Sequence, residues 1–322
     1  MTFCIELTAP GGVENLSLVR KRVGAPGFGE IRMRQRAAGV NFIDIYQRTG
    51  LYPLPLPAIL GVEGVGEVEA IGEGVEGVSV GDRVGYAGIP GGYAQRRLLP
   101  AWRAIPLPQM LPDTVAASSL LRAFTAHMLL KAVYNVTDGT NMLIHAGAGG
   151  LASLVIPWAK RMGAQVMTTT SSETKAVQAI KNGADRVIVG RNADIAKEVL
   201  AWTEGRGADY VIDGIGGPTF FASLNATAKF GMVASVGQAG GPIAPVCVED
   251  FGPMRSLSFS RPSVMAYLAN QARYKAVMPE IVEALSFGDG QFVGPQFDLK
   301  DAAAAQAALE DGTTMGAPVL LT

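Results

Sequence analysis

The sequence predicts an α/β protein with two domains, one rich in β-strands and one built on a doubly wound parallel sheet. The chain has 322 residues, more than a single domain usually holds. Residues 53–92 are dense in glycine and proline with short β-branched runs between them, which indicates short strands and tight turns. From about Pro112 onward, apolar strand patterns alternate with helical patterns, as in repeated β-α units of a parallel sheet.

The β-rich part covers residues 1 to about 120. Apolar side chains alternate or cluster at 62–71 and 82–86, so we expect strands of a small twisted sheet or barrel there, in which interior glycines permit sharp bends. Residues 114–134 carry apolar side chains at spacings of three and four, which predicts the first helix.

The next part of the chain repeats the order strand, turn and helix. We expect strands at 141–146, 165–169, 186–189, 209–213 and 232–236. Helices are expected between them at 151–162, 175–182, 195–202 and 218–226. Pro157 removes one backbone donor inside the first of these helices, so a kink or an early break is predicted there.

The C-terminal part is expected to form a strand, two helices and a last strand. Their ranges are 256–260, 263–286, 302–309 and 319–321. Because the backbone of a terminal strand needs a pairing partner, we expect this segment to return to the first domain. The predicted first domain therefore comprises 1–122 and 263–322, with 123–262 inserted as the doubly wound domain.

Composition and charge exclude several classes of function. Lys and Arg number 27 against 28 Asp and Glu, a net charge of -1, so no overall positive field would attract nucleic acid or anionic lipid. Cys4 and Cys247 cannot form a disulfide framework or a four-thiolate zinc site, which favours a reducing cytoplasmic compartment. The N-terminus lacks the pattern of a secretory signal, and the uncharged stretch 139–160 is too rich in glycine and polar residues for a membrane helix.

A glycine-rich turn follows the strand expected at 141–146. Gly147, Gly149 and Gly150 stand just before a helix, so a bare backbone and the positive end of the helix could meet a pyrophosphate. A plain turn would give the same residues. The position of this turn in the first of several β-α units favours a dinucleotide site.

The residues after the next strand bear on the choice of dinucleotide. Thr169 stands where an NAD site commonly has an acid for the ribose hydroxyls. Ser171, Ser172 and Lys175 instead offer hydroxyls and a cation for a 2′-phosphate, which favours NADPH and leaves NADH possible. Lys175 could equally be an ordinary surface residue.

Seven short motifs in order along the chain resemble the zinc-independent quinone oxidoreductases of the medium-chain dehydrogenase/reductase superfamily, the zeta-crystallin-like group. They are NFIDIYQRTGLYP at 41–53, GVEGVG at 61–66, GDRV at 81–84, HAGAGG at 145–150, WAK at 158–160, DGIG at 213–216 and SRP at 260–262. The resemblance implies a GroES-like catalytic domain, a Rossmann domain that holds NADPH, and an active site in the cleft between them. Such enzymes pass hydride to quinones or other conjugated carbonyls.

The resemblance also implies chemistry without a metal. Zinc-dependent relatives would carry a histidine at the position of Val62, and His127 and His145 do not form a recognisable ligand group. Asn41 and Tyr52 match the residues that face the nicotinamide and the acceptor. Tyr52 would donate a hydrogen bond to the developing oxyanion, and Asn41 would orient the reactants, although a packing tyrosine and a turn amide are the ordinary alternatives.

The cofactor contacts that the resemblance implies come from both domains. They are Phe42, Ile43, Asp44, Tyr46, Thr125, Gly149, Gly150, Leu151, Ser171, Ser172, Lys175, Gly237, Gln238, Phe259, Ser260 and Arg261. Each also has an ordinary explanation: Gly237 could only form a turn, Arg261 could serve a structural ion pair, and Thr125 could only cap or pack.

Four departures from the family pattern weaken the case for strict NADPH use. Gly190 replaces a tyrosine that often covers the adenosine phosphate, and 312–317 lacks the usual basic residue. His127 stands where an aromatic is expected, and Ala152 replaces the last glycine of the turn. We therefore expect relaxed selectivity for NADPH over NADH.

Two other functions remain open. The first is reduction of enones, alkenals or enoyl thioesters, which needs the same hydride donor and the same polarising group. The second is a non-catalytic nucleotide-binding or RNA-binding protein, which would need a basic groove lined with aromatics. The basic groupings are Lys21, Arg22, Arg96, Arg97 and Arg103, which we expect in solvated loops. The resemblance also implies a homodimer, with 256–260 as the candidate edge strand.

Overall fold

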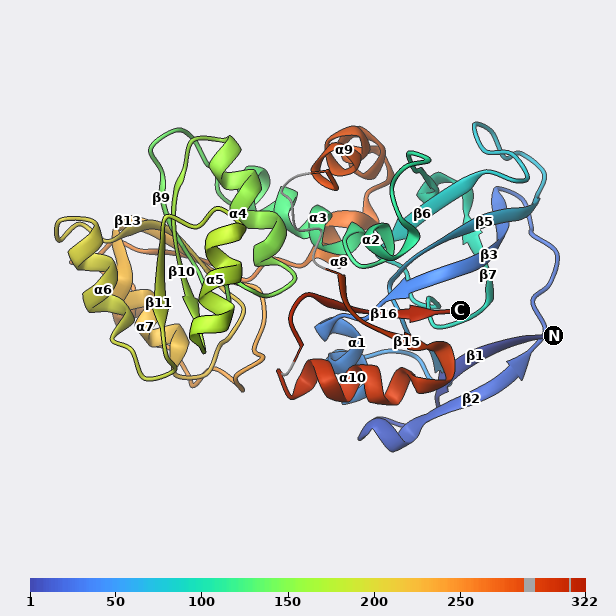
Figure 1. The fold of residues 1–322 in the computed structure, drawn as a ribbon, viewed down its shortest axis with the longest axis horizontal. Coiled ribbons are helices and arrows are strands. Elements are labelled where there is room, and N and C mark those ends of the chain that lie inside the picture. The colour runs from blue at the N-terminus through green and yellow to red at the C-terminus, as the bar shows by residue number, and fades with distance from the viewer. Residues whose placement is uncertain (287–292, 313) are drawn as a thin grey trace. The chain divides into compact units, whose positions relative to one another are not determined.

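The structure is a computed structural model that describes residues 1–286, 293–312 and 314–322 (Figure 1). It divides into two compact units, of which the second consists of 125–263 and the first of the other described residues. The described residues do not include 287–292 and Thr313. Both fall in the predicted segment 263–322, and Thr313 also falls in the stretch 312–317.

Unit 1 contains two β-sheets, and the larger one is built around a long central strand. Its order is β15-β16-β3-β5-β6-β8, with β7 also paired to β3. The strands are β3 (Glu30–Gly39), β5 (Glu63–Ile71), β6 (Arg83–Ala87), β7 (Arg96–Pro100), β8 (Ile105–Pro106), β15 (Val293–Asp298) and β16 (Ala317–Leu321). The smaller sheet has the order β2-β1-β4, formed by Leu16–Lys21, Thr2–Leu7 and Ala58–Ile59. The strands expected at 62–71 and 82–86 correspond to β5 and β6, which pair antiparallel.

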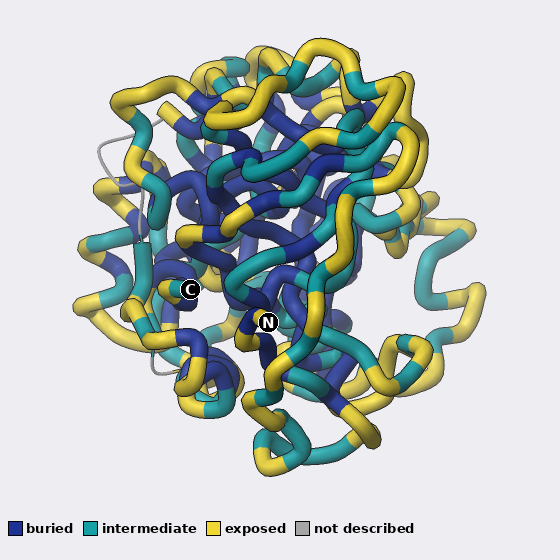
Figure 2. Tube along the Cα trace, turned by 90° about the vertical axis from the view of Figure 1, so that its right-hand side faces the viewer, coloured by how far each residue is buried: buried dark blue, intermediate teal, exposed yellow. Residues whose placement is uncertain are grey.

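The C-terminal strand completes the larger sheet of unit 1. β16 pairs antiparallel with β3, with Val319 opposite Gly39 and Leu321 opposite Ala37. Buried apolar residues of this unit surround the sheet, and Figure 2 shows them in the interior of the trace with exposed positions on the outer loops. The chain therefore leaves this unit after Phe124 and returns to it at Val264, and its last strand pairs within the larger sheet.

Helices and 3₁₀ turns complete unit 1. These are α1 (Phe42–Arg48), α2 (Asp113–Ala117), α8 (Val264–Ala269), α9 (Gln271–Ala284), α10 (Ala302–Glu310), and single 3₁₀ turns at Val13–Asn15, Ala101–Arg103 and Leu299–Asp301. The prediction of one helix over 263–286 was wrong, because Asn270 ends α8 and caps α9 by accepting a hydrogen bond from the backbone of Arg273 at 2.9 Å.

The helix predicted over 114–134 is also divided. It consists of α2, α3 (Leu120–His127) and a π-helical turn at Met128–Val133, with a break at Ser118. The Ser118 hydroxyl donates to the carbonyl of Val115, a local bond that competes with continuation of the helix.

Unit 2 is a six-stranded parallel sheet of order β11-β10-β9-β12-β13-β14. Its strands are β9 (Asn141–Ile144), β10 (Gln165–Thr170), β11 (Arg186–Val189), β12 (Ala208–Asp213), β13 (Thr227–Ser235) and β14 (Ser258–Ser260). Numbered within the unit, the order is 3-2-1-4-5-6, that of a doubly wound dinucleotide-binding fold, so the predicted fold class is confirmed. The expected edge strand, β14, lies at one edge of the sheet.

Helices connect the parallel strands of unit 2. They are α4 (Ala152–Arg161), α5 (Glu173–Lys181), α6 (Ile195–Trp202) and α7 (Thr219–Ala226), with a 3₁₀ turn at Val248–Asp250 (Figure 1). Of the kink or early break predicted at Pro157, the early break does not occur, because α4 continues to Arg161, and the kink stays a prediction. The apolar face of α4, with Val155, Ile156 and Trp158 buried, holds the helix in place despite the one missing donor.

Candidate functional site

The glycine-rich turn lies at the carboxyl end of β9 and leads into α4. Ala146 adopts a positive φ of 59°, and the backbone N–H of Gly149 donates to its carbonyl at 2.7 Å. A Cβ on Gly147 would lie 2.5 Å from the Thr168 side chain, so only glycine lets the turn pack this closely against β10. Leu151 is the N-cap of α4, and Gly150 precedes it. The turn therefore offers bare backbone and a helix N-terminus to an anion.

Three residues predicted to meet a 2′-phosphate lie where β10 ends and α5 begins. Ser171 and Ser172 are exposed, and Lys175 is half-buried. The Ser172 hydroxyl caps α5 by accepting from the backbone N–H of Lys175 at 3.4 Å. Gly190 follows the neighbouring strand β11, and its N–H donates to the carbonyl of Thr170 at 2.9 Å. The end of β10 thus has hydroxyls, the cation of Lys175 and the exposed carboxylate of Glu173, with no side chain at position 190.

The carboxyl end of β13 brings together two more predicted residues. Nη1 of Arg261 donates to the hydroxyl of Ser235 at 2.9 Å, and its Nη2 donates to Oε1 of Gln238 at 3.3 Å. A Cβ on Gly237 would lie 2.9 Å from the carbonyl of Gly214, so this glycine is needed for close packing of two turns. Sequence reasoning missed Ser235, which no motif marks.

Three other predicted residues of unit 2 have mainly structural surroundings. The ring of Phe259 packs edge to face on Phe220, with centroids 5.5 Å apart, and lies 5.7 Å from the ring of Phe251. Ser260 is paired with Ala234 in the sheet. Thr125 lies in α3 and is half-buried.

In unit 1, Asn41 is the N-cap of α1 and its side chain is buried. Its Nδ2 donates to Oε1 of Glu63 at 2.7 Å, and Oε2 of Glu63 accepts from the backbone N–H of Leu121 at 2.7 Å. Oδ2 of Asp44 accepts from the backbone of Asn41 and from the hydroxyl of Tyr93, each at 2.9 Å. The Asp44 side chain therefore faces the interior, where it caps α1. Glu63 and Tyr93 were missed by sequence reasoning as partners of these residues.

Tyr52 belongs to a row of aromatic side chains beside α1. Its ring meets that of Tyr46 edge to face, with centroids 5.2 Å apart, and Tyr46 lies 6.1 Å from Phe42. The backbone N–H of Tyr52 donates to the carbonyl of Tyr46 at 2.9 Å. Tyr52 is 37% exposed, so its phenol can reach a ligand. Ile43, on the same helix, is half-buried.

Burial perturbs the ionisation of the acidic groups in unit 1. Desolvation raises the pKa of Asp44 to about 7, against the hydrogen bonds from Asn41 and Tyr93. Desolvation also raises the pKa of Glu63, and the nearby Arg122 guanidinium opposes that shift. The pKa of Tyr93 lies well above its usual value, first because of burial and then because of the charge of Asp44. This cluster therefore holds two carboxyl groups in an apolar environment.

The donor set in this region does not suit zinc. Val62 is fully buried and carries no donor atom, and Glu63 is occupied by Asn41 and Leu121. Within the described ranges, no group of three or more His, Cys, Asp and Glu residues could hold a metal ion. The residues present therefore do not fit a catalytic zinc site.

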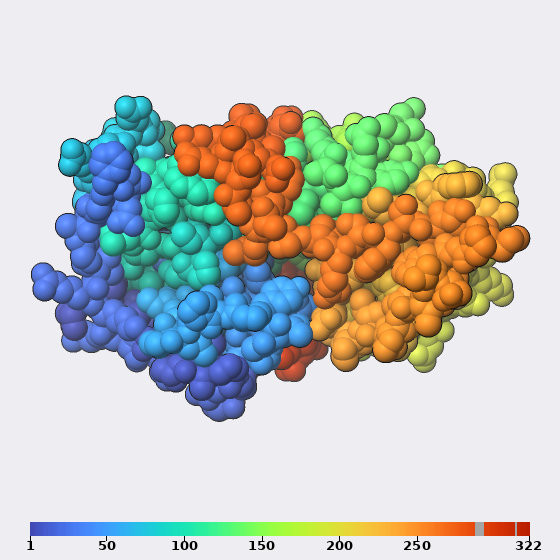
Figure 3. All heavy atoms as spheres, turned by 180° about the vertical axis from the view of Figure 1, so that it is seen from behind, coloured from blue at the N-terminus to red at the C-terminus, as the bar shows by residue number. Residues whose placement is uncertain are grey.

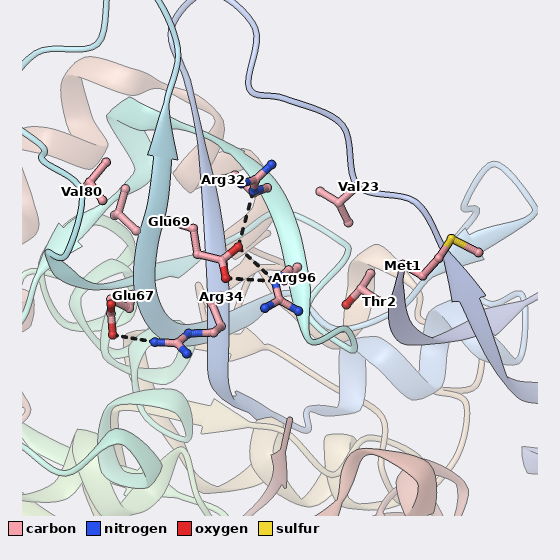
Figure 4. Close-up of a pocket in the computed structure, with 10 residues that line it drawn as sticks. Met1, Thr2, Val23, Arg32, Arg34, Glu67, Glu69, Val80 and Arg96 are labelled. Atoms are coloured by element: carbon pink, nitrogen blue, oxygen red, sulfur yellow. Dashed lines mark hydrogen bonds and ion pairs between the residues drawn. The ribbon is translucent and has the colours of Figure 1, made fainter.

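A pocket of about 570 Å³ lies elsewhere on unit 1, and none of the predicted site residues lines it (Figure 4). Its charged side chains pair with one another. Glu69 accepts from Arg96 at 2.9 Å and lies 3.4 Å from Arg32, and Glu67 accepts from Arg34 at 3.1 Å. We interpret this face as cross-strand ion pairs on a solvated sheet.

The expectation of solvated loops is wrong for four of the five basic residues: Lys21 ends β2, Arg96 and Arg97 lie in β7, and Arg103 lies in a 3₁₀ turn. Arg97 and Arg103 are also buried. Arg97 stacks over Tyr86 at 4.5 Å from the ring centre. Arg103 donates to the carbonyl of Ala87 at 2.9 Å. Both satisfy backbone carbonyls in the interior, so they are unavailable to a polyanion.

Comparison with known families and proteins identifies both units. Residues 27–109 match the alcohol dehydrogenase GroES-like domain, and 150–283 match the zinc-binding dehydrogenase family. A quinone oxidoreductase of Pseudomonas aeruginosa is 37% identical over 320 residues, 98% of each chain. A 2-haloacrylate reductase of a Burkholderia species is 38% identical over 321 residues, 97% of this chain and 96% of that protein.

A solved structure agrees with these matches. The Escherichia coli quinone oxidoreductase complexed with NADPH superposes with a TM-score of 0.91 at 32% identity and covers 99% of this chain and 100% of its own. Within the described residues, we find no helix with the length and apolar character that crossing a membrane requires. The motifs, the sheet order and the near full-length matches agree that this chain belongs to the quinone oxidoreductases of the medium-chain dehydrogenase/reductase superfamily.

Proposed function

We propose that the protein is an NADPH-dependent quinone reductase. The observation that carries the proposal is the turn at Gly147–Gly150, with its bare backbone at the N-terminus of α4 on a sheet of dinucleotide-binding order. Relatives of nearly the same length are quinone oxidoreductases, and one of them is known in complex with NADPH.

The residues of unit 2 fit this coenzyme. We assign the pyrophosphate to Gly149, Gly150 and Leu151, which form the end of the glycine-rich turn and the N-terminus of α4. The 2′-phosphate is assigned to Ser171, Ser172 and Lys175, which offer hydroxyls and a cation. Gln238 and Arg261, which are hydrogen-bonded to each other, are assigned to the remaining cofactor contacts with Gly237, Phe259, Ser260 and Thr125.

Unit 1 supplies the groups for the reaction. When bound, NADPH supplies the hydride that reduces the quinone. We assign Tyr52 as the hydrogen-bond donor to the oxygen on which negative charge develops. The amide of Asn41, held by Glu63, orients the reactants, and Phe42, Ile43 and Tyr46 of α1 form the rest of the nicotinamide site, with Asp44 contributing only its backbone because its side chain faces the interior. Because Val62 has no donor atom and the Asn41 amide is bonded to Glu63, we propose that the acceptor carbonyl is polarised without a metal.

A second candidate acceptor is a conjugated carbonyl or carboxylate. The relative that reduces 2-haloacrylate supports this alternative. The same Tyr52 phenol would stabilise the enolate that forms when hydride adds to the conjugated double bond. The test is NADPH oxidation with matched quinones, enones, an enoyl thioester and 2-haloacrylate. A preference in kcat/KM of about two hundredfold for a non-quinone would overturn the proposal.

We further propose a homodimer in a reducing, cytoplasmic compartment. Among the strands that the structure describes, β14 lies at the edge of its sheet and pairs with β13 alone, and the residues around 250 form a continuous stretch on the surface of unit 2 (Figure 3). Met254 and Phe230 are exposed near it, as an interface would require. Cys4 and Cys247 are both free thiols. Light scattering on the purified chain tests the dimer, and a monomer at micromolar concentration would contradict it.

The RNA-binding alternative has less support. Arg97 and Arg103 are buried, and Arg96 is paired with Glu69. If the purified protein reduced none of the acceptors and bound RNA in a salt-sensitive way, RNA binding would be the better-supported function.

A further inference from the structure

A chain of hydrogen bonds crosses the carboxyl edge of the sheet in unit 2, with His145 at its centre. Nδ1 of His145 lies 3.1 Å from the hydroxyl oxygen of Thr169, at the end of β10. Its Nε2 lies 2.8 Å from the hydroxyl oxygen of Ser223, in α7. Ser223 in turn donates to Oδ2 of Asp213 at 3.2 Å, at the end of β12. His145, Ser223 and Asp213 are buried, so these contacts are shielded from water.

The acceptors of the Ser223 hydroxyl determine which nitrogen of His145 carries the proton. Asp213 is fully buried, and the Ser223 hydroxyl has two acceptors, Oδ2 of Asp213 at 3.2 Å and the carbonyl of Thr219 at 3.0 Å, so its single proton points away from His145 with either of them. The Ser223 oxygen then accepts from Nε2–H of His145, which leaves Nδ1 as an acceptor for the Thr169 hydroxyl. His145 is thus a neutral imidazole, in agreement with burial, which lowers its pKa more than Asp213 raises it.

At one end of the chain, Thr169 holds the first two residues of the glycine-rich turn. Its hydroxyl oxygen accepts from the backbone N–H of Ala146 at 3.3 Å, and its carbonyl accepts from that of Gly147 at 3.0 Å. Ala146 has a φ of 59°, a region that a residue with a Cβ rarely adopts, so the turn depends on these bonds to keep its shape.

At the other end, Asp213 holds the turn that follows β12. Its Oδ1 accepts from the backbone N–H of Ile215 at 2.8 Å and from that of Gly216 at 2.9 Å. The chain therefore connects the turns after β9, β10 and β12, and a dinucleotide lies along this edge of such a sheet.

We propose that His145 is a positioning residue for NADPH, which it does not touch: through Thr169 and Ser223 it holds the cofactor-binding turns in register. A neutral imidazole suits this role because it donates on one side and accepts on the other. The inference rests on the proposed coenzyme and is independent of the acceptor that is reduced.

The first test is Ser223→Ala, which cuts the link between His145 and Asp213 with little change in volume. We expect the dissociation constant of NADPH, measured by nicotinamide fluorescence without any acceptor, to rise about 5- to 10-fold. The matched control is Thr203→Val at the opposite edge of the sheet, where a buried hydroxyl donates to the carbonyl of Val199 and accepts from Gly207, both at 2.8 Å. The control should lower the melting temperature and leave the dissociation constant unchanged.

A double-mutant cycle separates positioning from general stability. His145→Asn can still accept from Thr169 and cannot reach Ser223, so adding Ser223→Ala to it should weaken NADPH binding no further. Thr169→Val removes the hydrogen bond at the other end, between Thr169 and His145. It should weaken NADPH binding, and this test does not depend on whether the Ser223 variant folds. The proposal would be overturned if the losses in NADPH affinity from His145→Asn and Ser223→Ala were additive. It would also be overturned if these variants lowered the melting temperature and left the affinity for NADPH unchanged. Wild-type protein that failed to bind NADPH would overturn the coenzyme assignment as well.

Discussion

The side-chain amide of Asn41 donates a hydrogen bond of 2.7 Å to the carboxylate of Glu63, and both groups are buried. Asn41 begins α1 and Glu63 begins β5, so this bond ties the helix that carries the predicted site to the large sheet of unit 1. The second carboxylate oxygen of Glu63 accepts from the backbone of Leu121 at 2.7 Å. Glu63 thus accepts two hydrogen bonds on two oxygens.

Glu63→Gln should impair the enzyme without changing the shape of the side chain. A glutamine offers one acceptor oxygen and one NH₂ group, so either Asn41 or Leu121 would face a donor. We expect a loss of about 1 to 3 kcal/mol in the free energy of unfolding and a lower kcat/KM for the acceptor. Glu67→Gln, on the same strand and paired with exposed arginines, is the control and should change neither by much. Equal effects of the two variants would contradict this prediction.

Gly39→Ala tests the space that the Glu63 carboxylate occupies. A Cβ at position 39 would lie 2.3 Å from Oε1 of Glu63 and 2.3 Å from the carbonyl of Ala117. We expect destabilisation of about 1 to 3 kcal/mol, measured by denaturant unfolding, because the backbone must shift. Gly24→Ala, where a Cβ would meet nothing within 4 Å, is the control and should be neutral or slightly stabilising.

Tyr52→Phe removes the proposed hydrogen-bond donor and keeps the edge-to-face contact with Tyr46. We expect kcat to fall about 10²-fold, the size typical of a lost oxyanion donor, while the dissociation constant of NADPH stays the same. Tyr134→Phe, on a ring that stacks against Tyr210 in unit 2, is the control. Unchanged turnover by Tyr52→Phe would show that Tyr52 only packs.

The sequence predicted the sheet of unit 2 well because each β-α unit carries its own local pattern. It failed where a single polar side chain ends a helix, as at Asn270, and the early break that it allowed at Pro157 does not occur, because packing holds α4 together there. The bond between Asn41 and Glu63 could not be foreseen, because it depends on how β5 lies beside α1. The chain through His145 was missed for the same reason, since Ser223 lies 78 residues from it in the sequence. The roles assigned to the site residues stay predictions.

Lys175→Met tests the choice between the two coenzymes. Lys175 lies in the first turn of α5, beside the exposed hydroxyls of Ser171 and Ser172. Only NADPH carries a 2′-phosphate, so we expect its dissociation constant to rise about tenfold and that of NADH to stay the same. Lys181→Met, in the last turn of the same helix, is the control. If both coenzymes weakened equally, Lys175 would not read the 2′-phosphate.

Asp44→Asn should change how stability depends on pH. Burial raises the pKa of Asp44 to about 7 in the folded chain, well above about 3.9 in an unfolded one. The folded chain therefore binds the proton more tightly, and the stability that this group contributes is fully present below about pH 4 and is lost as the pH rises through 7. The neighbouring Glu63 carboxyl, whose pKa is also raised, acts in the same direction, and Arg122 opposes both shifts.

The asparagine in this variant cannot ionise, and its oxygen can still accept from the backbone of Asn41 and from Tyr93. We expect the variant to be more stable than the wild type at pH 8, by at most about 4 kcal/mol, with the difference shrinking by pH 5. Denaturant unfolding at several pH values measures this, and Glu76→Gln in an exposed loop is the control. Parallel stability curves for the wild type and Asp44→Asn would mean that Asp44 does not titrate in this range.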